Sequence, residues 1–209
     1  RGLGDVYKRQ VRAVGEPLRR FEEDALRILR LYRFAARFGF VIDEATEAAA
    51  KQLAAHLDCV SVERIEEELN KLLSAPKPGA YLEPEVLAFV LPELPPDYLS
   101  EAREIIDALP AGAEEVTTRW AALLLPLGED GTRKALKHLK CSNAVIDGVA
   151  TLVKEKAPRT PALPLQAKRL LGKYCLHTVQ QLTALWSALQ PERKDEFTAL
   201  PVSYTHLTL

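Results

Sequence analysis

An aspartate and three arginines stand at helical spacing near the start of the chain: Asp24, Arg27, Arg30 and Arg33. A carboxylate only accepts hydrogen bonds, and a guanidinium only donates them. Side by side in a cleft, Asp24 and Arg27 could read the amine and the neighbouring acceptor of cytosine or adenine, whereas guanine and uracil present the opposite polarity. Arg30 and Arg33 could meet triphosphate oxygens or keep Asp24 ionised. The simpler alternative is a solvated helix face with a local ion pair worth about 0.2–0.5 kcal/mol.

Residues 20–39 are expected to form the single amphipathic helix that positions these side chains. At about 100° per residue, apolar residues fall on one side and form a core-facing stripe, namely Phe21, Ala25, Ile28, Leu29, Tyr32, Ala35 and Ala36. The opposite arc carries Arg20, Arg27, Arg30, Arg33 and Arg37. Gly39 is a natural residue to end this helix.

The rest of the chain predicts further helices separated by proline and glycine, without a convincing strand pair. The expected helices cover residues 44–57, 62–73, 81–90, 98–109, 114–125, 132–139, 143–156, 166–174, 178–189 and 192–200. The predicted fold class is all-α, an elongated multi-helix array.

Residues 158–164 are the best linker candidate. We expect three helical domains, at 11–75, 76–157 and 158–200. The ends, 1–10 and 201–209, lack the helical period. We interpret them as non-native tails and leave them out of the fold.

Composition narrows the function classes. The 209 residues carry a formal charge of −1, with 47% hydrophobic and 27% charged residues, which is typical of a soluble globular protein. No apolar run is long enough to span a bilayer, so we expect no membrane partner. The three scattered cysteines favour buried thiols in a reducing compartment, and we expect the cytoplasm. Any nucleic-acid contact must come from local basic patches. One such run, Arg133, Lys134 and Lys137, could contact tRNA phosphates, or it could be an ordinary solvated face.

Residues 12–43, RAVGEPLRRFEEDALRILRLYRFAARFGFVID, resemble the neck of bacterial class II CCA-adding enzymes, in the tRNA nucleotidyltransferase and poly(A) polymerase superfamily. The segments SVERIEEEL at 61–69 and LPEL at 91–94 resemble the next family blocks. The resemblance implies an intact enzyme that adds C, C and A to tRNA 3′ ends from CTP and ATP without a nucleic-acid template. It implies that Asp24 and Arg27 act as the template, that Arg30 and Arg33 make further nucleotide contacts, and that Glu23 and Arg64 support them.

The residues for nucleotidyl transfer itself are not found. Two-metal transfer needs clustered carboxylates that hold Mg²⁺, and in this family an N-terminal head supplies them with a Gly-Ser loop and an Asp-x-Asp pair. The sequence contains neither motif. We therefore expect a fragment that selects nucleotides but is inactive alone, with Mg²⁺ bound by the head of the intact enzyme.

Other chemistry is not indicated. The four histidines are isolated and lack metal-ligand spacing, so no metal site is expected in this chain. Leu125 and Pro126 stand where some relatives carry the His-Asp pair of a phosphohydrolase, and we predict a buried helix end there. Two alternatives stay open: a poly(A) polymerase of the same superfamily, and a non-catalytic helical RNA-binding or interaction module. The sequence does not fix the oligomeric state.

Overall fold

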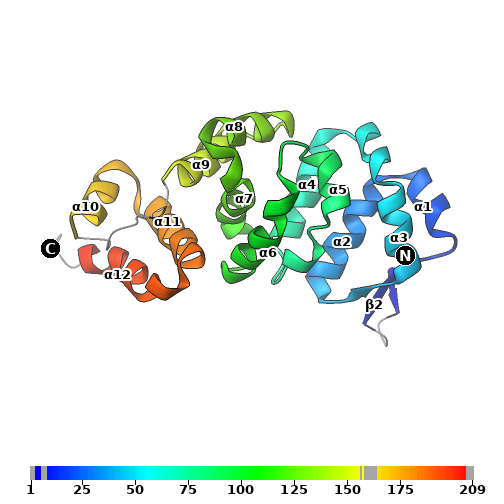
Figure 1. Ribbon diagram of the computed structural model, residues 1–209, viewed down its shortest axis with the longest axis horizontal. Coiled ribbons are helices and arrows are strands. Elements are labelled where there is room, and N and C mark those ends of the chain that lie inside the picture. The colour runs from blue at the N-terminus through cyan, green and yellow to red at the C-terminus, as the bar shows by residue number, and fades with distance from the viewer. Residues whose placement is uncertain (1–2, 6–8, 156, 158–163, 206–209) are drawn as a thin grey trace.

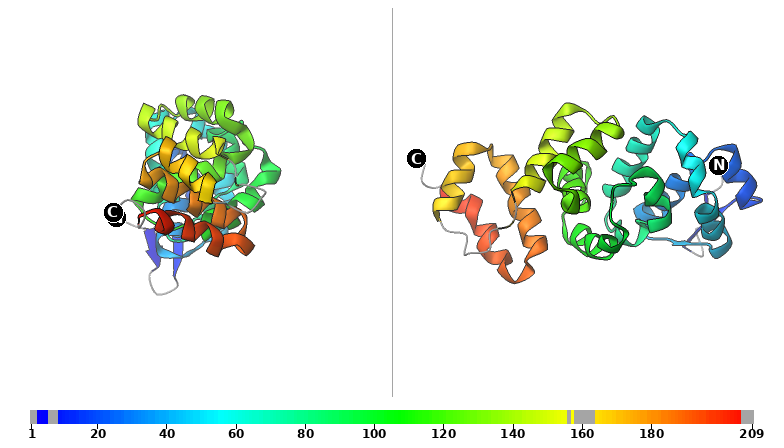
Figure 2. Two further views of the ribbon diagram at one scale, coloured as in Figure 1. Left: turned by 90° about the vertical axis from the view of Figure 1, so that its left-hand side faces the viewer. Right: turned by 45° about the horizontal axis from the view of Figure 1, so that its top comes forward.

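The computed structural model describes residues 3–5, 9–155, 157 and 164–205. Helices follow one another along an elongated molecule, from α1–α3 at one end to α10–α12 at the other (Figure 1). The right-hand view of Figure 2 shows the same succession, and the left-hand view looks along the long axis of the molecule. This arrangement confirms the predicted all-α elongated array. No helix in the described residues is long and apolar enough to cross a bilayer.

The helices are α1 (Pro17–Glu23), α2 (Leu26–Phe38), α3 (Glu44–Gln52), α4 (Val62–Leu73), α5 (Pro84–Val90), α6 (Leu99–Ala108), α7 (Val116–Leu124), α8 (Gly128–His138), α9 (Asn143–Lys154), α10 (Pro164–Lys173), α11 (Leu176–Leu189) and α12 (Lys194–Thr205). Short 3₁₀ turns join several of them, the longest at Ala54–Cys59.

A small sheet corrects the expectation that strands are absent. It has the order β1-β2-β3, formed by β1 (Leu3–Asp5), β2 (Gln10–Ala13) and β3 (Val41–Ile42), with β1 antiparallel and β3 parallel to β2. Such short strands show no alternation in the sequence. Parts of both chain ends that were left out of the expected fold take up regular secondary structure, because β1 uses residues 3–5 and α12 continues to Thr205. That these ends are non-native tails stays a prediction.

The predicted single helix at 20–39 is broken in two. Asp24 has an extended backbone (φ −156°, ψ 100°), so α1 ends before it and α2 begins after Ala25. The Leu26 N–H donates to Asp24 Oδ1 at 3.2 Å instead of continuing a helical ladder. A short acidic side chain that bonds the nearby backbone competes with the helix in this way. Gly39 ends α2 in the left-handed conformation (φ 64°), as expected.

The predicted apolar stripe is buried in spite of the break. All seven of its side chains, from Phe21 to Ala36, are at most 9% exposed. α2 packs against α4, whose predicted bounds are confirmed at both ends. Trp120 and Trp186 are core residues.

Two other helices differ in their bounds from the predicted ones, one because a 3₁₀ turn follows it and one because its first turn is acidic. The helix expected at 44–57 stops at Gln52, and the one expected at 132–139 already begins at Gly128. Acidic side chains in that first turn favour the helix N-terminus. Asp43 caps α3 and Ser142 caps α9, because their side chains accept hydrogen bonds from the Thr46 and Val145 N–H groups. Most of the predicted linker, residues 158–163, lies outside the described residues.

The expectation of buried thiols holds for one cysteine only. Cys141 is buried, and burial raises the pKa of its thiol to about 11. Cys59 and Cys175 are exposed free cysteines.

A buried arginine joins α7 to the end of α4. Arg119 is fully buried, and its guanidinium donates to the backbone oxygens of Leu73 and Ala75 at 2.5 Å and of Leu109 at 3.0 Å. It therefore satisfies carbonyls that a helix end leaves without a partner. Burial lowers the pKa of Arg119, and the charges of Asp107 and Glu115 oppose that shift.

Glu155, at the C-terminal end of α9, contacts residues of the tail helices. Lys173 Nζ and Tyr174 Oη donate to Glu155 Oε1 at 2.6 and 2.7 Å. Trp186 Nε1 donates to the Glu155 backbone oxygen at 2.9 Å. Although burial raises the pKa of Glu155, the hydrogen bonds from Lys173 and Tyr174 outweigh it, so the pKa lies below its usual 4.5.

We expect the tail to loosen in acid. A carboxyl whose pKa is lower in the folded state stabilises that state fully above its unfolded pKa, and the contribution is lost as pH falls through the folded pKa. Glu155→Gln should remove roughly 1–2 kcal/mol at neutral pH and abolish this acid dependence below about pH 4.5. Amide hydrogen exchange of α11 as a function of pH measures it. Glu22→Gln, which changes an exposed carboxylate in α1, is the control. Identical exchange profiles for Glu155→Gln and the unsubstituted chain would refute the role.

Candidate nucleotide-binding site

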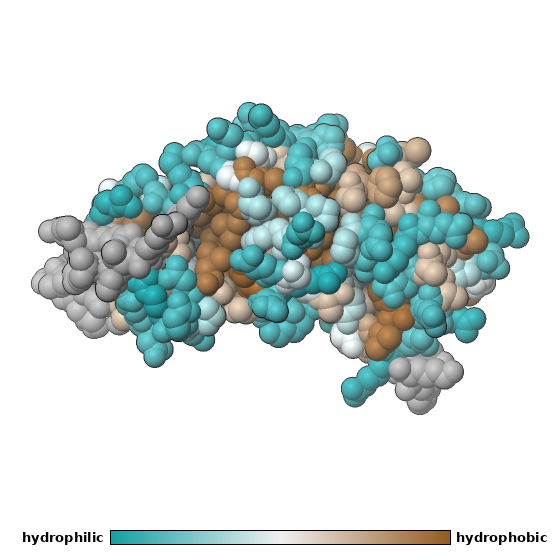
Figure 3. All heavy atoms as spheres, in the orientation of Figure 1, coloured by the Kyte–Doolittle hydropathy of each residue, from teal (hydrophilic) through white to brown (hydrophobic). Residues whose placement is uncertain are grey.

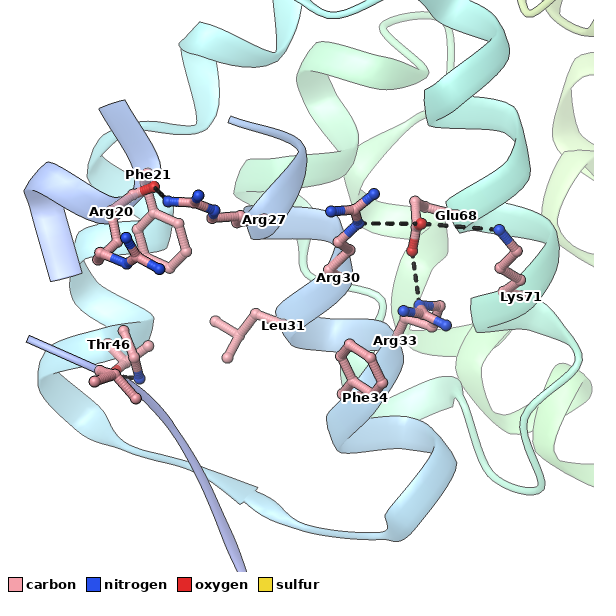
Figure 4. A pocket seen from close by; sticks show the side chains of 12 residues that line it. Arg20, Phe21, Arg27, Arg30, Leu31, Arg33, Phe34, Thr46, Glu68 and Lys71 are labelled. Carbon is pink, nitrogen blue, oxygen red and sulfur yellow. Dashed lines mark hydrogen bonds and ion pairs between the residues drawn. The ribbon is translucent and has the colours of Figure 1, made fainter. Parts of the chain in front are cut away.

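A cavity of about 660 Å³ lies between α1, α2 and α4, and its polar wall is mostly cationic. Five basic side chains line it, namely Arg20, Arg27, Arg30, Arg33 and Lys71, and Figure 4 shows them around one opening. Apolar residues of α1 and α2, including Phe21 and Phe34, complete the wall. A cavity of this size and charge suits an anionic small molecule.

Among the described residues that line this cavity, Glu68 on α4 is the only acid. Its side chain is 5% exposed, and Oε2 lies 2.7 Å from Arg33 Nε. Oε1 lies 3.4 Å from Arg30 Nε and 3.9 Å from Lys71 Nζ (Figure 4). The Arg33 contact is close but is not aligned as a hydrogen bond, so we describe it as an ion pair. Glu68 thus acts as an internal counter-ion for three cations.

Asp24 lies at the break between α1 and α2. Its Oδ1 is engaged by the Leu26 N–H, whereas Oδ2 lies 3.6 Å from Arg64 Nη2 and 3.9 Å from Arg30 Nη1. The Asp24 side chain is 25% exposed and is not part of the cavity wall. Oδ1 therefore accepts a hydrogen bond from the first residue of α2, and Oδ2 faces two guanidinium groups.

Arg27 reaches back across the same break. Its Nη1 donates to the Arg20 backbone oxygen at 2.8 Å and to Glu23 Oε2 at 2.6 Å. The hydrogen bond from Arg27 lowers the pKa of Glu23. The local Asp24–Arg27 ion pair weighed in the sequence is not formed in the described residues, because each partner contacts other groups.

The expected residues are therefore brought together only in part. Glu23 contacts Arg27, Arg64 contacts Asp24, and both lie beside the cavity. Elsewhere, Arg133 on α8 pairs with Asp147 at 2.6 Å, while Lys134 and Lys137 are exposed. Among the described residues, no group of three or more His, Cys, Asp or Glu side chains gathers to hold a metal ion.

Sequence reasoning missed the α4 side of the cavity. Glu68 and Lys71 stand three residues apart on a correctly predicted helix, so their shared face could be read from the sequence. Their apposition to Arg30 and Arg33 depends on how α4 packs against α2, which helical periodicity alone does not specify.

The chain is similar to a known protein family and to CCA-adding enzymes. Residues 39–96 match a family described as "Probable RNA and SrmB- binding site of polymerase A". The CCA-adding enzyme of Limosilactobacillus reuteri (strain DSM 20016) is 35% identical over 96% of this chain and 52% of its own length.

Two solved structures resemble the chain. The Bacillus stearothermophilus CCA-adding enzyme in complex with CTP is 28% identical over 94% of this chain and 51% of its own, with a TM-score of 0.68. The Thermotoga maritima CCA-adding enzyme complexed with tRNA shares the fold, with a TM-score of 0.73 and 19% identity over 98% of this chain and 53% of its own. The chain thus spans about half the length of the relatives it matches.

Proposed function

The chain belongs to the CCA-adding enzyme family, and on that premise we propose that it is the nucleotide-selecting part of a tRNA nucleotidyltransferase that adds CCA to tRNA 3′ ends from CTP and ATP. Residues 11–75 form the neck in this proposal, 76–157 the body and 158–200 the tail. The observation that carries it is the arginine-lined cavity beside Asp24. The CTP complex of the Bacillus stearothermophilus relative supports it.

Base selection uses the two sides of the α1–α2 break. Both observed contacts of Arg27 use Nη1, and its Nε and Nη2 have no hydrogen-bond partner among the described residues. These groups are available to donate to a ring acceptor of cytosine or adenine, while Asp24 Oδ2 accepts from the exocyclic amine. The hydrogen bonds to Arg20 and Glu23 hold the guanidinium in place, and fixed donors and acceptors discriminate best.

Arg30 and Arg33 supply positive charge further along the cavity. Without a ligand, Glu68 balances them. Triphosphate oxygens are stronger acceptors for guanidinium groups because they carry more charge and suit bidentate contacts. Glu68 then keeps both arginines on the cavity side of α2 while their outer donors meet the ligand.

The proposal also covers tRNA binding and the place of nucleotidyl transfer. tRNA is the macromolecular partner, and Lys134 and Lys137 on α8 contact its phosphates, with Arg133 contributing less because Asp147 already pairs with it. Mg²⁺ and the transfer chemistry belong to a head domain that precedes this part in the intact enzyme. Carboxylates of that head would hold Mg²⁺, which would supply positive charge at the triphosphate and at the attacking hydroxyl.

Calorimetric titration of the chain with the four nucleoside triphosphates tests the proposal. We expect CTP and ATP to bind roughly tenfold or more tightly than GTP and UTP, because one bidentate base contact is worth about 1–3 kcal/mol. Binding of ATP alone would point to a poly(A) polymerase. Equal binding of all four would instead favour a helical module without base selection.

A further inference from the structure

Three phenylalanines, Phe34, Phe38 and Phe40, form a surface that we call the aromatic strip. Phe34 and Phe38 lie in the C-terminal half of α2, and Phe40 comes just after that helix. The rings of Phe34 and Phe38 are parallel within 1° with centroids 6.3 Å apart, and the Phe40 centroid lies 5.7 Å from that of Phe38. Phe38 is 56% exposed, a large fraction for an aromatic side chain. In Figure 3 the face in view is largely hydrophilic, with separate hydrophobic patches, one of them beside the strands.

Arginines alternate with these rings along the helix. The Arg33 guanidinium carbon lies 4.1 Å from the Phe34 centroid, and that of Arg37 lies 5.8 Å from the Phe38 centroid. Residues four apart lie on one side of a helix, about 6 Å along its axis. α2 therefore presents a column of two arginines beside a column of two phenylalanines.

A second cavity, of about 510 Å³, opens beside the arginine column. Arg33, Arg37, Lys71 and Ser74 line it together with Ala75 and Pro76. It shares Arg33 and Lys71 with the nucleotide-binding cavity, so the two cavities adjoin. Glu68 engages Arg33 and Lys71, but Arg37 has no ion-pair partner in the described part of the chain.

We propose that the aromatic strip and the cavity beside it bind the unpaired end of an RNA strand. Bases stack on Phe38 and its neighbours, and Arg37 and Lys71 contact the phosphates. Proteins commonly bind single-stranded nucleic acid with aromatic side chains beside a cationic groove. The bases stack on the aromatic rings, because every base has a flat π face, and the groove binds the phosphates.

Two observations favour RNA over other occupants of this surface. Charge complementarity is the first, since two arginines flank the rings and one of them, Arg37, is exposed. The second is continuity, because the family match for RNA binding begins at Gly39 and includes Phe40, Lys71 and Ser74. The inference rests on the proposed function in one respect: the bound strand would be the one whose end receives the selected nucleotide.

Fluorescence anisotropy of the chain with a short labelled oligocytidylate tests this inference. Phe38→Ala should weaken binding about tenfold, as expected for one lost stacking contact, and Phe38→Trp should restore it. Arg37→Gln should also weaken binding and reduce its salt dependence, which Phe38→Ala leaves unchanged. Phe89→Ala is the matched control: Phe89 lies on α5 and is 42% exposed.

The outcomes separate this inference from the proposed function. If oligocytidylate does not bind, or binds equally to Phe38→Ala and the unsubstituted chain, the inference is overturned. A change in sedimentation of Phe38→Ala without a change in RNA affinity would assign the strip to self-association instead, and would also overturn it. RNA binding that depends on Phe38, in a chain that does not distinguish the four nucleotides, would support the inference and reject base selection.

Discussion

Replacing Arg119 with methionine is expected to lower the free energy of unfolding by at least about 3 kcal/mol. Methionine roughly preserves the length and apolar stem of the side chain but leaves three buried backbone oxygens, those of Leu73, Ala75 and Leu109, without their donor. Each unsatisfied buried carbonyl costs about 1–3 kcal/mol. Urea denaturation followed by circular dichroism measures the loss.

An exposed arginine provides the control. Arg133 forms two ion pairs on the surface of α8, at 2.6 and 3.7 Å. Exposed ion pairs contribute about 0–1 kcal/mol, so Arg133→Met should be nearly neutral. If Arg119→Met were as mild as Arg133→Met, the buried guanidinium would not be holding α7 to α4.

Features that depend on a single helix could be predicted from the sequence. Contacts between two helices could not. The bounds of α4 followed from its helical period and from the proline and glycine after it. The buried stripe of α2 followed from the same periodicity. The opposition of Glu68 to Arg33 could not follow, because periodicity gives the face of each helix and not which faces meet.

The helix break at Asp24 was hidden for a related reason. No glycine or proline marks it, and Phe21 and Ala25 on either side fit one continuous apolar stripe. The break exists because Asp24 bonds the Leu26 N–H. Strand β3, only two residues long, pairs with β2 some thirty positions earlier, and no local pattern announces such a partner.

This break changes what Arg27 is expected to do. On a continuous helix, Asp24 and Arg27 would have been local ion-pair candidates. In the structure Asp24 starts α2, while Arg27 donates to the last turn of α1 and to Glu23. These contacts fix Asp24 in the turn between the two helices and Arg27 in the first turn of α2. Arg27 Nε and Nη2 and Asp24 Oδ2 are then the groups that could bind a base.

Arg27→Ala should therefore abolish most of the selectivity while leaving the fold intact. The Arg27 side chain is 33% exposed, and its contacts to the protein are one backbone oxygen and one exposed carboxylate, so the stability cost is about 1 kcal/mol. Loss of a bidentate base contact costs about 1–3 kcal/mol of discrimination, roughly tenfold to a hundredfold. Arg27→Lys should lose it too, because an ammonium keeps the charge without the fork of donors.

The central claim is that Asp24 and Arg27 choose the nucleotide, and one measurement tests it most directly. The chain is joined to the part of the Limosilactobacillus reuteri relative that it does not match. Incorporation of each of the four nucleotides into tRNA is compared between the unsubstituted protein and Arg27→Ala, with Arg19→Ala, an exposed arginine of α1 that does not line the cavity, as control. We predict that the unsubstituted protein and the control incorporate C and A, and that Arg27→Ala loses the preference over G and U. An unchanged preference for C and A in Arg27→Ala would contradict the account.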